Sequence, residues 1–351
     1  MSRGRRAVTI TAMRAAAHLT FIAALLCSTV FAQAPLPVVQ LVTPQPFDEW
    51  LAALRAEAEG RGLPVELLDR TLSGIQPVEQ ILERDRTQTE FTLDLEQYLK
   101  RRLTRDTVKT AQQMYAKHRT VLGAIEKQYG IPAPVLVSVW GLESNFGRFA
   151  GVRPTIPTLV TLAYDPRRGP MFRNELFSAL EIINRGDIEL ENLKGSWAGA
   201  LGQPQFMPSS YLQYAQDFDG DGRKDIWSST PDVFASVANF LQQHGWTKGA
   251  RWGREVRIPK ALNETALAIP HREAGCRATR LMTDPRTLSE WRKFGLLTTT
   301  GSALPKADVT ASLVIAGTRS FLVYENYDAL LGYNCAHTYT LSVALLSDLI
   351  K

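Results

Sequence analysis

The chain has few cysteines, no low-complexity tract and no internal repeat. Only 3 of its 351 residues are cysteine, which excludes a small domain held together mainly by disulfides. Its 24 glycines and 19 prolines follow no collagen-like pattern. A hydrophobic content of 45% with 21% charged residues excludes a disordered chain. We therefore expect a globular protein of two or three domains.

Apart from its N-terminus, the chain also has no large excess of positive or negative charge. The first 14 residues contain no acid and four arginines, Arg3, Arg5, Arg6 and Arg14. An apolar run over 15–31 follows, and the pattern predicts a secretory signal peptide over 1–32. Without these arginines the formal net charge of +5 falls to about +1. This value gives no electrostatic case for binding nucleic acid, and we expect a periplasmic protein with partners in the cell envelope.

Other interpretations of the N-terminus are weaker. A transmembrane anchor is disfavoured because the apolar run is short and is interrupted by His18 and Thr20. A lipid anchor on Cys27 is disfavoured because Leu26, rather than a small residue, precedes it. The paired arginines at positions 5 and 6 leave the choice between general and twin-arginine export open.

The rest of the chain predicts a mainly α protein of the α+β class. Residues 33–46 hold four prolines and predict an extended tether. Residues 47–130 keep the three-and-four apolar spacing of amphipathic helices, and helical patterns continue through 131–249. Alternating and β-branched runs predict a small β module over 250–332. This module either has a structural role or binds the cell wall. Residues 333–351 predict a C-terminal helix that packs back on the central region.

Two cysteines remain in the expected mature chain, Cys276 and Cys335. They either form a disulfide in an oxidising compartment or stay as two buried thiols. The sequence favours neither alternative.

One carboxylate stands out in the central region. Glu143 follows the apolar run 133–142, which has little polar relief. The dipole at a helix C-terminus and apolar neighbours both disfavour an ionised carboxylate, so we expect a raised pKa. A general acid near neutral pH needs such a pKa. On these residues alone, an exposed glutamate at the end of a core helix is the alternative.

A second segment, 195–211, is rich in small residues and then in polar and aromatic ones. It reads Gly-Ser-Trp-Ala-Gly-Ala-Leu-Gly-Gln-Pro-Gln-Phe-Met-Pro-Ser-Ser-Tyr. Small residues let a ligand approach the backbone, and glutamine, serine and aromatic side chains suit the groups of a sugar ring. A tight packing turn explains the glycines equally well.

Together the two segments resemble the B-type lytic murein transglycosylases. The resemblance rests on Gly-Leu-Glu-Ser-Asn-Phe-Gly around Glu143, on Tyr-Asp-Pro-Arg-Arg ending at Arg168, and on the glycine-rich run, in that order. It extends from about residue 47 to the C-terminus. It implies a lysozyme-like catalytic core over 131–249 and an enzyme that cuts the glycan strands of peptidoglycan.

The resemblance also implies residue roles. Glu143 matches a single catalytic acid and base, and Arg167 and Arg168 match groove residues whose guanidinium groups suit carboxylates. The other expected substrate-binding residues are Ser144, Ser196, Gln205, Phe206, Met207 and three tyrosines around the acid, Tyr98, Tyr333 and Tyr339. Phe240 stands where the family has a tyrosine, so a hydroxyl contact is lost there. Solubility for the arginines and core packing for the tyrosines are the alternatives.

The run 217–225 matches the first half of an EF-hand loop. Asp217, Asp219 and Asp221 occupy ligand positions 1, 3 and 5, and Arg223 offers a backbone carbonyl at position 7. Ser228 occupies position 12, where glutamate is usual, and the resemblance implies closure by a later aspartate, here Asp232. We expect a structural Ca²⁺ site, and a metal-free turn rich in aspartate is the alternative.

The implied reaction needs no cofactor and no second carboxylate. Glu143 would protonate the β-1,4 oxygen between N-acetylmuramic acid and N-acetylglucosamine, then deprotonate the muramoyl C6 hydroxyl to form a 1,6-anhydromuramoyl end. A hydrolytic muramidase normally uses two carboxylates, and Asp165 or Asp217 would be its second. A non-catalytic, calcium-stabilised wall-binding protein is the other alternative. We expect a monomer that acts on peptidoglycan strands, and the sequence leaves protein partners open.

Overall fold

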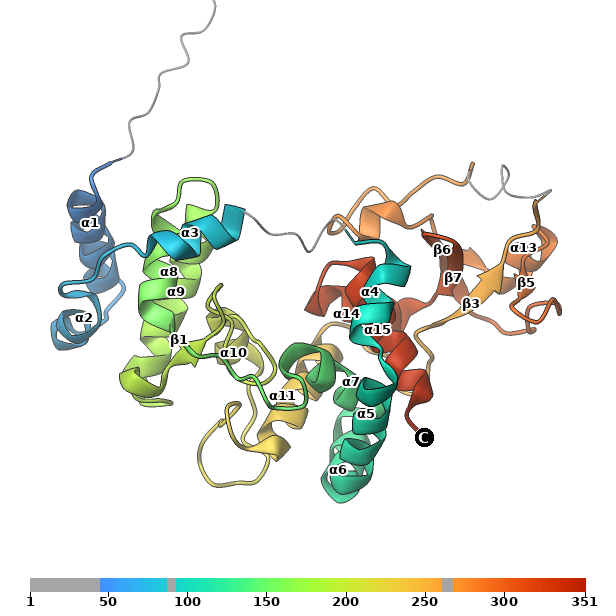
Figure 1. Cartoon of the computed structure of the whole chain (residues 1–351), viewed down its shortest axis with the longest axis horizontal. Helices are drawn as coiled ribbons and strands as arrows, with labels where there is room; N and C mark the ends of the chain where they lie inside the picture. The colour runs from blue at the N-terminus through green and yellow to red at the C-terminus, as the bar shows by residue number, and fades with distance from the viewer. Residues whose placement is uncertain (1–44, 87–92, 261–267) are drawn as a thin grey trace, which may run out of the picture. The chain divides into compact units, whose positions relative to one another are not determined.

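The computed structural model describes residues 45–86, 93–260 and 268–351 (Figure 1). The expected signal peptide over 1–32 and nearly all of the tether over 33–46 lie outside these ranges. Within the described ranges, none of the helices combines the length and apolar character needed to span a bilayer.

Helices dominate the first part of the chain, so the mainly α prediction is confirmed. They are α1 (Phe47–Gly60), α2 (Val65–Leu72), α3 (Glu79–Arg86), α4 (Leu95–Arg102), α5 (Arg105–Lys117) and α6 (Arg119–Tyr129). Two begin at capping side chains: Asp94 accepts the Gln97 amide of α4 at 2.8 Å, and Thr104 accepts the Thr107 amide of α5 at 3.1 Å. α6 ends at Gly130, whose φ of 76° is left-handed.

The central helices surround one that is buried on nearly all sides. They are α7 (Ala133–Ser144), α8 (Thr155–Tyr164), α9 (Gly169–Asn184), α10 (Pro208–Tyr214) and α11 (Thr230–Gln243). α7 packs against α5, α6 and α11, and α8 lies beside α9 (Figure 1). The short strands β1 (Arg153–Pro154) and β2 (Lys194–Gly195) pair antiparallel, and this pairing joins the loop after α7 to the glycine-rich segment.

The C-terminal part carries an antiparallel sheet in the order β4-β6-β7-β3-β5. The strands are β3 (Gly253–Arg257), β4 (Arg286–Thr287), β5 (Leu297–Thr298), β6 (Thr310–Ala316) and β7 (Arg319–Val323). Phe321 of the central strand β7 lies opposite Val314 of β6 and Glu255 of β3. With Trp291 of α13 (Leu288–Lys293), the sheet buries its own apolar cluster, which ends at Tyr324, short of the boundary at 332 that the sequence suggested.

The last two helices belong to the larger core. Tyr327 of α14 (Glu325–Tyr333) is fully buried there, and α15 (His337–Leu349) packs against α7 and α4. A disulfide joins Cys276 to Cys335, with a Cα–Cα distance of 6.2 Å, so the first of the two alternatives for these cysteines holds. It fastens the segment before β4 to the turn between α14 and α15.

Candidate active site

Glu143 lies at the C-terminal end of the buried helix α7 and is itself only partly buried. Three residues with positive φ follow closely: Asn145 at 50°, Phe146 at 57° and Gly147 at 80°. A left-handed conformation costs a residue other than glycine about 1–3 kcal/mol. Surrounding contacts must therefore hold this turn in place.

Ser144 supplies two of those contacts. Its side chain is fully buried, its hydroxyl donates to the Trp140 carbonyl at 2.9 Å, and its oxygen accepts the Gly147 amide at 3.0 Å. A fully buried hydroxyl cannot reach a sugar. The expectation that Ser144 binds substrate is therefore corrected, because Ser144 shapes the turn behind Glu143.

Gln203 is a functional candidate that the sequence did not single out. Trp140 Nε1 donates to Gln203 Oε1 at 2.6 Å, and Gln203 Nε2 donates to the Trp227 carbonyl at 2.7 Å. A Cβ placed on Gly147 would lie 2.7 Å from the same Oε1. Gln203 thus ties the turn after Glu143 to the glycine-rich segment. In the sequence, only its position in the glycine-rich segment points to Gln203, and Gln205 occupies the same segment.

Tyr333 and Tyr339, from separate helices, lie beside Glu143, and Tyr98 from a third helix lies beside Tyr339. Burial raises the pKa of Tyr339 well above its usual value, and the neighbouring Glu143 carboxylate, Tyr333 and, least, Tyr98 raise it further. Burial also raises the pKa of Tyr333, with a smaller contribution from Glu143. The Tyr333 hydroxyl donates to the Pro204 carbonyl at 2.6 Å. Both hydroxyls therefore keep their protons over the whole working pH range and can donate hydrogen bonds.

Two of the expected sugar-binding aromatics are buried instead. Phe206 is 2% exposed and Phe240 is 6% exposed, and their ring centroids lie 5.6 Å apart. The Phe240 ring lies 4.8 Å from that of Tyr333 and stacks on His244 at 3.9 Å. Direct sugar contacts by these two rings are therefore corrected to packing contacts that support Tyr333.

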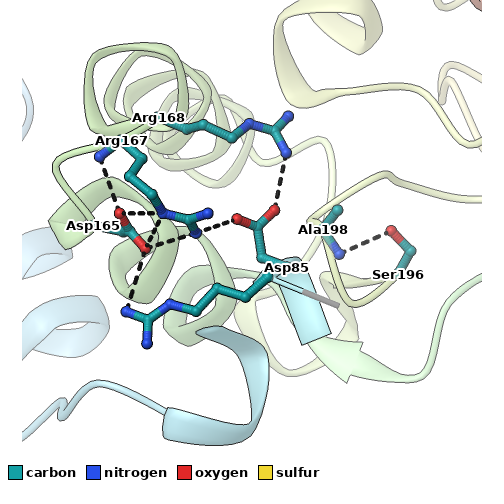
Figure 2. Close-up of polar contacts among 7 residues, drawn as sticks. Asp85, Asp165, Arg167, Arg168, Ser196 and Ala198 are labelled. Atoms are coloured by element: carbon teal, nitrogen blue, oxygen red, sulfur yellow. Dashed lines mark hydrogen bonds and ion pairs between the residues drawn. The ribbon is translucent and has the colours of Figure 1, made fainter. Parts of the chain in front are cut away.

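The glycine-rich segment folds as a tight turn with polar groups at its surface. The Ser196 hydroxyl oxygen accepts the Ala198 amide at 3.3 Å (Figure 2). It also accepts the Ala200 amide at 3.1 Å. Gln205 has a φ of 54° and its Nε2 donates to the Gly202 carbonyl at 2.7 Å. Ser196, Gln205 and Met207 are all partly exposed. These three side chains remain accessible to a ligand.

Arg167 and Arg168 are held by two buried carboxylates (Figure 2). Asp85 of α3 contacts Arg167 Nη2 at 2.7 Å with one oxygen and Arg168 Nη1 at 2.9 Å with the other. Asp165 contacts Arg167 Nη2 at 2.9 Å, and the hydrogen bonds from Arg167 lower the pKa of Asp165. The Asp85 and Asp165 side chains are 3% and 5% exposed, whereas those of Arg167 and Arg168 are 47% and 43% exposed.

The acidic loop brings three carboxylates together. One oxygen from each of Asp217, Asp219 and Asp221 lies within 4.8 Å of the others. Such hard oxygen donors in a compact exposed loop fit Ca²⁺. The Arg223 amide donates to Asp221 at 2.8 Å, so this residue lies in the same turn.

Asp232 lies outside that group of carboxylates. It is fully buried at the start of α11, where it accepts the amides of Phe218 at 2.8 Å and Asp225 at 2.9 Å. Burial raises its pKa. In this arrangement the Asp232 carboxylate holds both ends of the loop by accepting their backbone amides, whereas the sequence suggested a metal ligand.

Comparison with known proteins decides the family. The profile of the transglycosylase SLT domain matches residues 46–348, nearly all of the described chain. This chain belongs to the lytic transglycosylase family. The family resemblance drawn from the three sequence motifs is thereby confirmed.

Individual relatives support the same assignment. The chain is 39% identical to membrane-bound lytic murein transglycosylase B of Escherichia coli (strain K12) over 153 residues, 43% of this chain and 42% of that protein. The match thus spans less than half the length of this curated relative. The crystal structure of SltB3 from Pseudomonas aeruginosa in complex with NAG-anhNAM-pentapeptide has a TM-score of 0.78 and 39% identity, covering 87% of this chain and 79% of SltB3. The structure of Escherichia coli Slt35 in complex with calcium has a TM-score of 0.71 and 27% identity, covering 87% of this chain and 92% of Slt35.

Proposed function

We propose that this lytic transglycosylase cleaves the β-1,4 bond between N-acetylmuramic acid and N-acetylglucosamine in peptidoglycan and leaves a 1,6-anhydromuramoyl end. The observation that carries the proposal is Glu143 at the end of α7, with Tyr333 and Tyr339 beside it and Tyr98 beside Tyr339. The complex of SltB3 with an anhydro muropeptide supports the same product class.

Glu143 acts twice in the proposed reaction. Its carboxyl group first donates a proton to the glycosidic oxygen, and the C1–O4 bond breaks as N-acetylglucosamine leaves. The neighbouring acetamido group of the muramoyl sugar stabilises the positive centre at C1. The Glu143 carboxylate then accepts the proton of the C6 hydroxyl as that oxygen bonds to C1. No water is consumed, and Glu143 regains its starting proton.

The hydrolytic alternative lacks an available second carboxylate among the candidates that the sequence named. Asp165 is buried against Arg167, and Asp217 accepts the amides of Gly220 and Gly222 at 2.8 and 2.9 Å. Each of these aspartates is therefore already engaged by neighbouring groups of its own segment. A binding protein without activity would have no use for an acid placed among proton-bearing tyrosines.

The exposed polar side chains near Glu143 would hold the glycan strand. We assign Ser196, Gln205 and Met207 to the sugars, and the exposed faces of Arg167 and Arg168 to substrate carboxylates. Tyr98, Tyr333 and Tyr339 would position Glu143 and the sugar next to it. The protein would act as a monomer in the periplasm, exported by residues 1–32, on the peptidoglycan found there.

Calcium, when bound, would stabilise the loop between α10 and α11 and take no part in the chemistry. Asp217, Asp219 and Asp221 would supply carboxylate oxygens, and Asp232 would keep the loop ends together. The calcium complex of Slt35 supports this assignment. We expect added Ca²⁺ to raise the melting temperature of the wild type and to have less effect on Asp219→Asn. An equal rise in both proteins would contradict a site at these residues.

Digestion of purified peptidoglycan tests the proposal. The chain from Gln33 onward, the variant Glu143→Gln and the control Glu66→Gln, an exposed glutamate of α2, are compared by mass spectrometry of the released muropeptides. Anhydro ends from the wild type and the control, but not from Glu143→Gln, would support both the reaction and the acid. Reducing ends would identify a muramidase, and intact glycan would favour a binding protein.

A further inference from the structure

Gln203 is covered by protein and uses both polar ends of its side-chain amide inside the fold. It is 6% exposed, its Oε1 accepts Trp140 Nε1 at 2.6 Å, and its Nε2 donates to the Trp227 carbonyl at 2.7 Å. Its backbone amide also donates to the Ile226 carbonyl at 2.9 Å. A side chain so covered cannot reach a sugar. Gln203 therefore acts on the protein and not on the substrate.

The contact with Trp140 bears on the end of α7. Trp140 is 3% exposed and lies about one helical turn before Glu143. On the other side of Glu143, a Cβ placed on Gly147 would lie 2.7 Å from Gln203 Oε1 and 3.2 Å from Trp140 Cζ2. The left-handed turn after Glu143 therefore closes on the same two side chains. Gln203 thus contacts the chain both before and after the proposed acid.

The next residue, Pro204, reaches the tyrosine beside the proposed acid. The Pro204 carbonyl accepts the Tyr333 hydroxyl at 2.6 Å, and Tyr333 lies next to Glu143. Two consecutive residues thus contact the helix that carries Glu143 and the tyrosine at its side. Because proline has a fixed φ, these two contacts move together as one unit.

The turn that carries Gln203 is itself held in place by its surroundings. The Leu201 amide donates to the Phe206 carbonyl at 2.6 Å, and the Phe206 amide donates to the Leu201 carbonyl at 3.1 Å. A Cβ placed on Gly202, whose φ is 61°, would lie 2.6 Å from the Ile226 carbonyl oxygen. The turn therefore has little room to shift, and the side chain of Gln203 links this fixed turn to α7.

We infer that Gln203 is a positioning residue for the transglycosylase reaction: its side-chain amide holds the end of α7 so that Glu143 keeps a fixed place relative to Tyr333. The inference rests on the proposed function, in which Glu143 first donates a proton to the leaving oxygen and then accepts one from the C6 hydroxyl. One position must suit both steps, and a displacement of about 1 Å can lower a rate about a hundredfold. Because Gln203 does not reach the sugar, its loss should lower kcat and leave KM nearly unchanged.

Kinetics on soluble peptidoglycan strands, together with melting temperatures, test the inference. Gln203→Met keeps the length of the side chain and removes both polar ends. The matched control is Trp291→Phe, which removes the buried bond from Trp291 Nε1 to the Ala311 carbonyl, 2.9 Å long, in the separate apolar cluster of the sheet. We expect Gln203→Met to lower kcat about 10- to 100-fold with KM within about threefold of the wild type. Trp291→Phe should lower the melting temperature as well but keep kcat within about twofold.

Gln203→Glu adds a measurement that a purely structural role would not change. A protonated carboxyl group offers Trp140 an acceptor oxygen and offers the Trp227 carbonyl a hydroxyl donor, as the amide does. Burial raises the pKa of a carboxyl group, so the introduced group keeps its proton in acid and loses it as pH rises. The ionised form has no donor for Trp227. We expect the kcat of Gln203→Glu to be close to that of the wild type near about pH 5, and to fall at least about fivefold relative to it by about pH 8.

The outcomes separate the inference from the proposed function. Gln203→Met with a lower melting temperature but an unchanged kcat would overturn the positioning role, and so would an equal loss of kcat in Trp291→Phe. A loss confined to KM would assign Gln203 to substrate binding and overturn it too. If Gln203→Met does not fold, the pH series decides, because a constant ratio of Gln203→Glu to wild type contradicts the inference. Full activity of Glu143→Gln would instead refute the proposed function, whatever the Gln203 variants show.

Discussion

Asp85→Asn tests how strongly the buried carboxylates hold the arginine pair. Asp85 gives one oxygen to Arg167 and the other to Arg168, and its side chain is 3% exposed. Asparagine keeps the shape but turns one acceptor into a donor that faces a guanidinium group. A lost charge-assisted hydrogen bond costs about 1.5–3 kcal/mol. The arginines keep water on their exposed sides, so we expect about 1–2 kcal/mol less stability.

Guanidinium unfolding followed by circular dichroism measures this loss. The matched control is Asp69→Asn, whose carboxylate pairs with Arg55 but is 60% exposed, and it should cost less than about 0.5 kcal/mol. A double-mutant cycle with Arg168→Gln should give a coupling of at least about 0.5 kcal/mol. Equal stability of Asp85→Asn and Asp69→Asn, or a coupling near zero, would refute the view that Asp85 holds the pair.

Three further predictions concern the turn, the acid limb and the disulfide. Gly147→Ala should lower the free energy of unfolding by about 2–4 kcal/mol and lower activity, because the new Cβ would displace Gln203 and the backbone there is left-handed. The control Gly186→Ala, with φ 73° and open space around it, should lose only about 1–2 kcal/mol in the same unfolding assay. The pKa of Asp165 is lowered in the folded state, so its contribution to stability is present above the unfolded pKa of about 4 and is lost as pH falls below it. In Arg167→Gln the stability should therefore fall less steeply with acid than in the wild type, and an unchanged pH dependence would contradict the pairing. Replacing both Cys276 and Cys335 by serine should lower the free energy of unfolding by up to about 4 kcal/mol, because the cross-link spans 59 residues. Reductant should lower the melting temperature of the wild type and leave that of the double variant unchanged.

The sequence was most informative where a residue's chemistry is tied to a local pattern. Glu143 could be found because an apolar helix that delivers a carboxylate is unusual, and α7 has this form. The strands β6 and β7 followed from alternation and β-branched residues. α8 was not singled out within the helical region 131–249, because half of its residues are threonine, isoleucine or valine, and burial against α9 overrides their weak helix propensity.

Burial and long-range partners were beyond the sequence. Ser144 and Phe206 have the chemistry of sugar contacts, but only the packing of α7 and of the aromatic cluster shows that they are covered. Asp85 meets Arg167 across 82 positions, and no local signal links the two. Gln203 and Gln205 differ only in which one the turn directs inward.

The most direct test of the single-carboxylate reaction is digestion of peptidoglycan in water enriched in heavy oxygen. If the muramoyl C6 hydroxyl attacks C1 after Glu143 protonates the leaving oxygen, the new muramoyl ends carry no heavy oxygen. Mass spectrometry should then find unlabelled anhydro ends from the wild type and none from Glu143→Gln. Labelled reducing ends as the first product would show that water attacks C1, and would contradict the account.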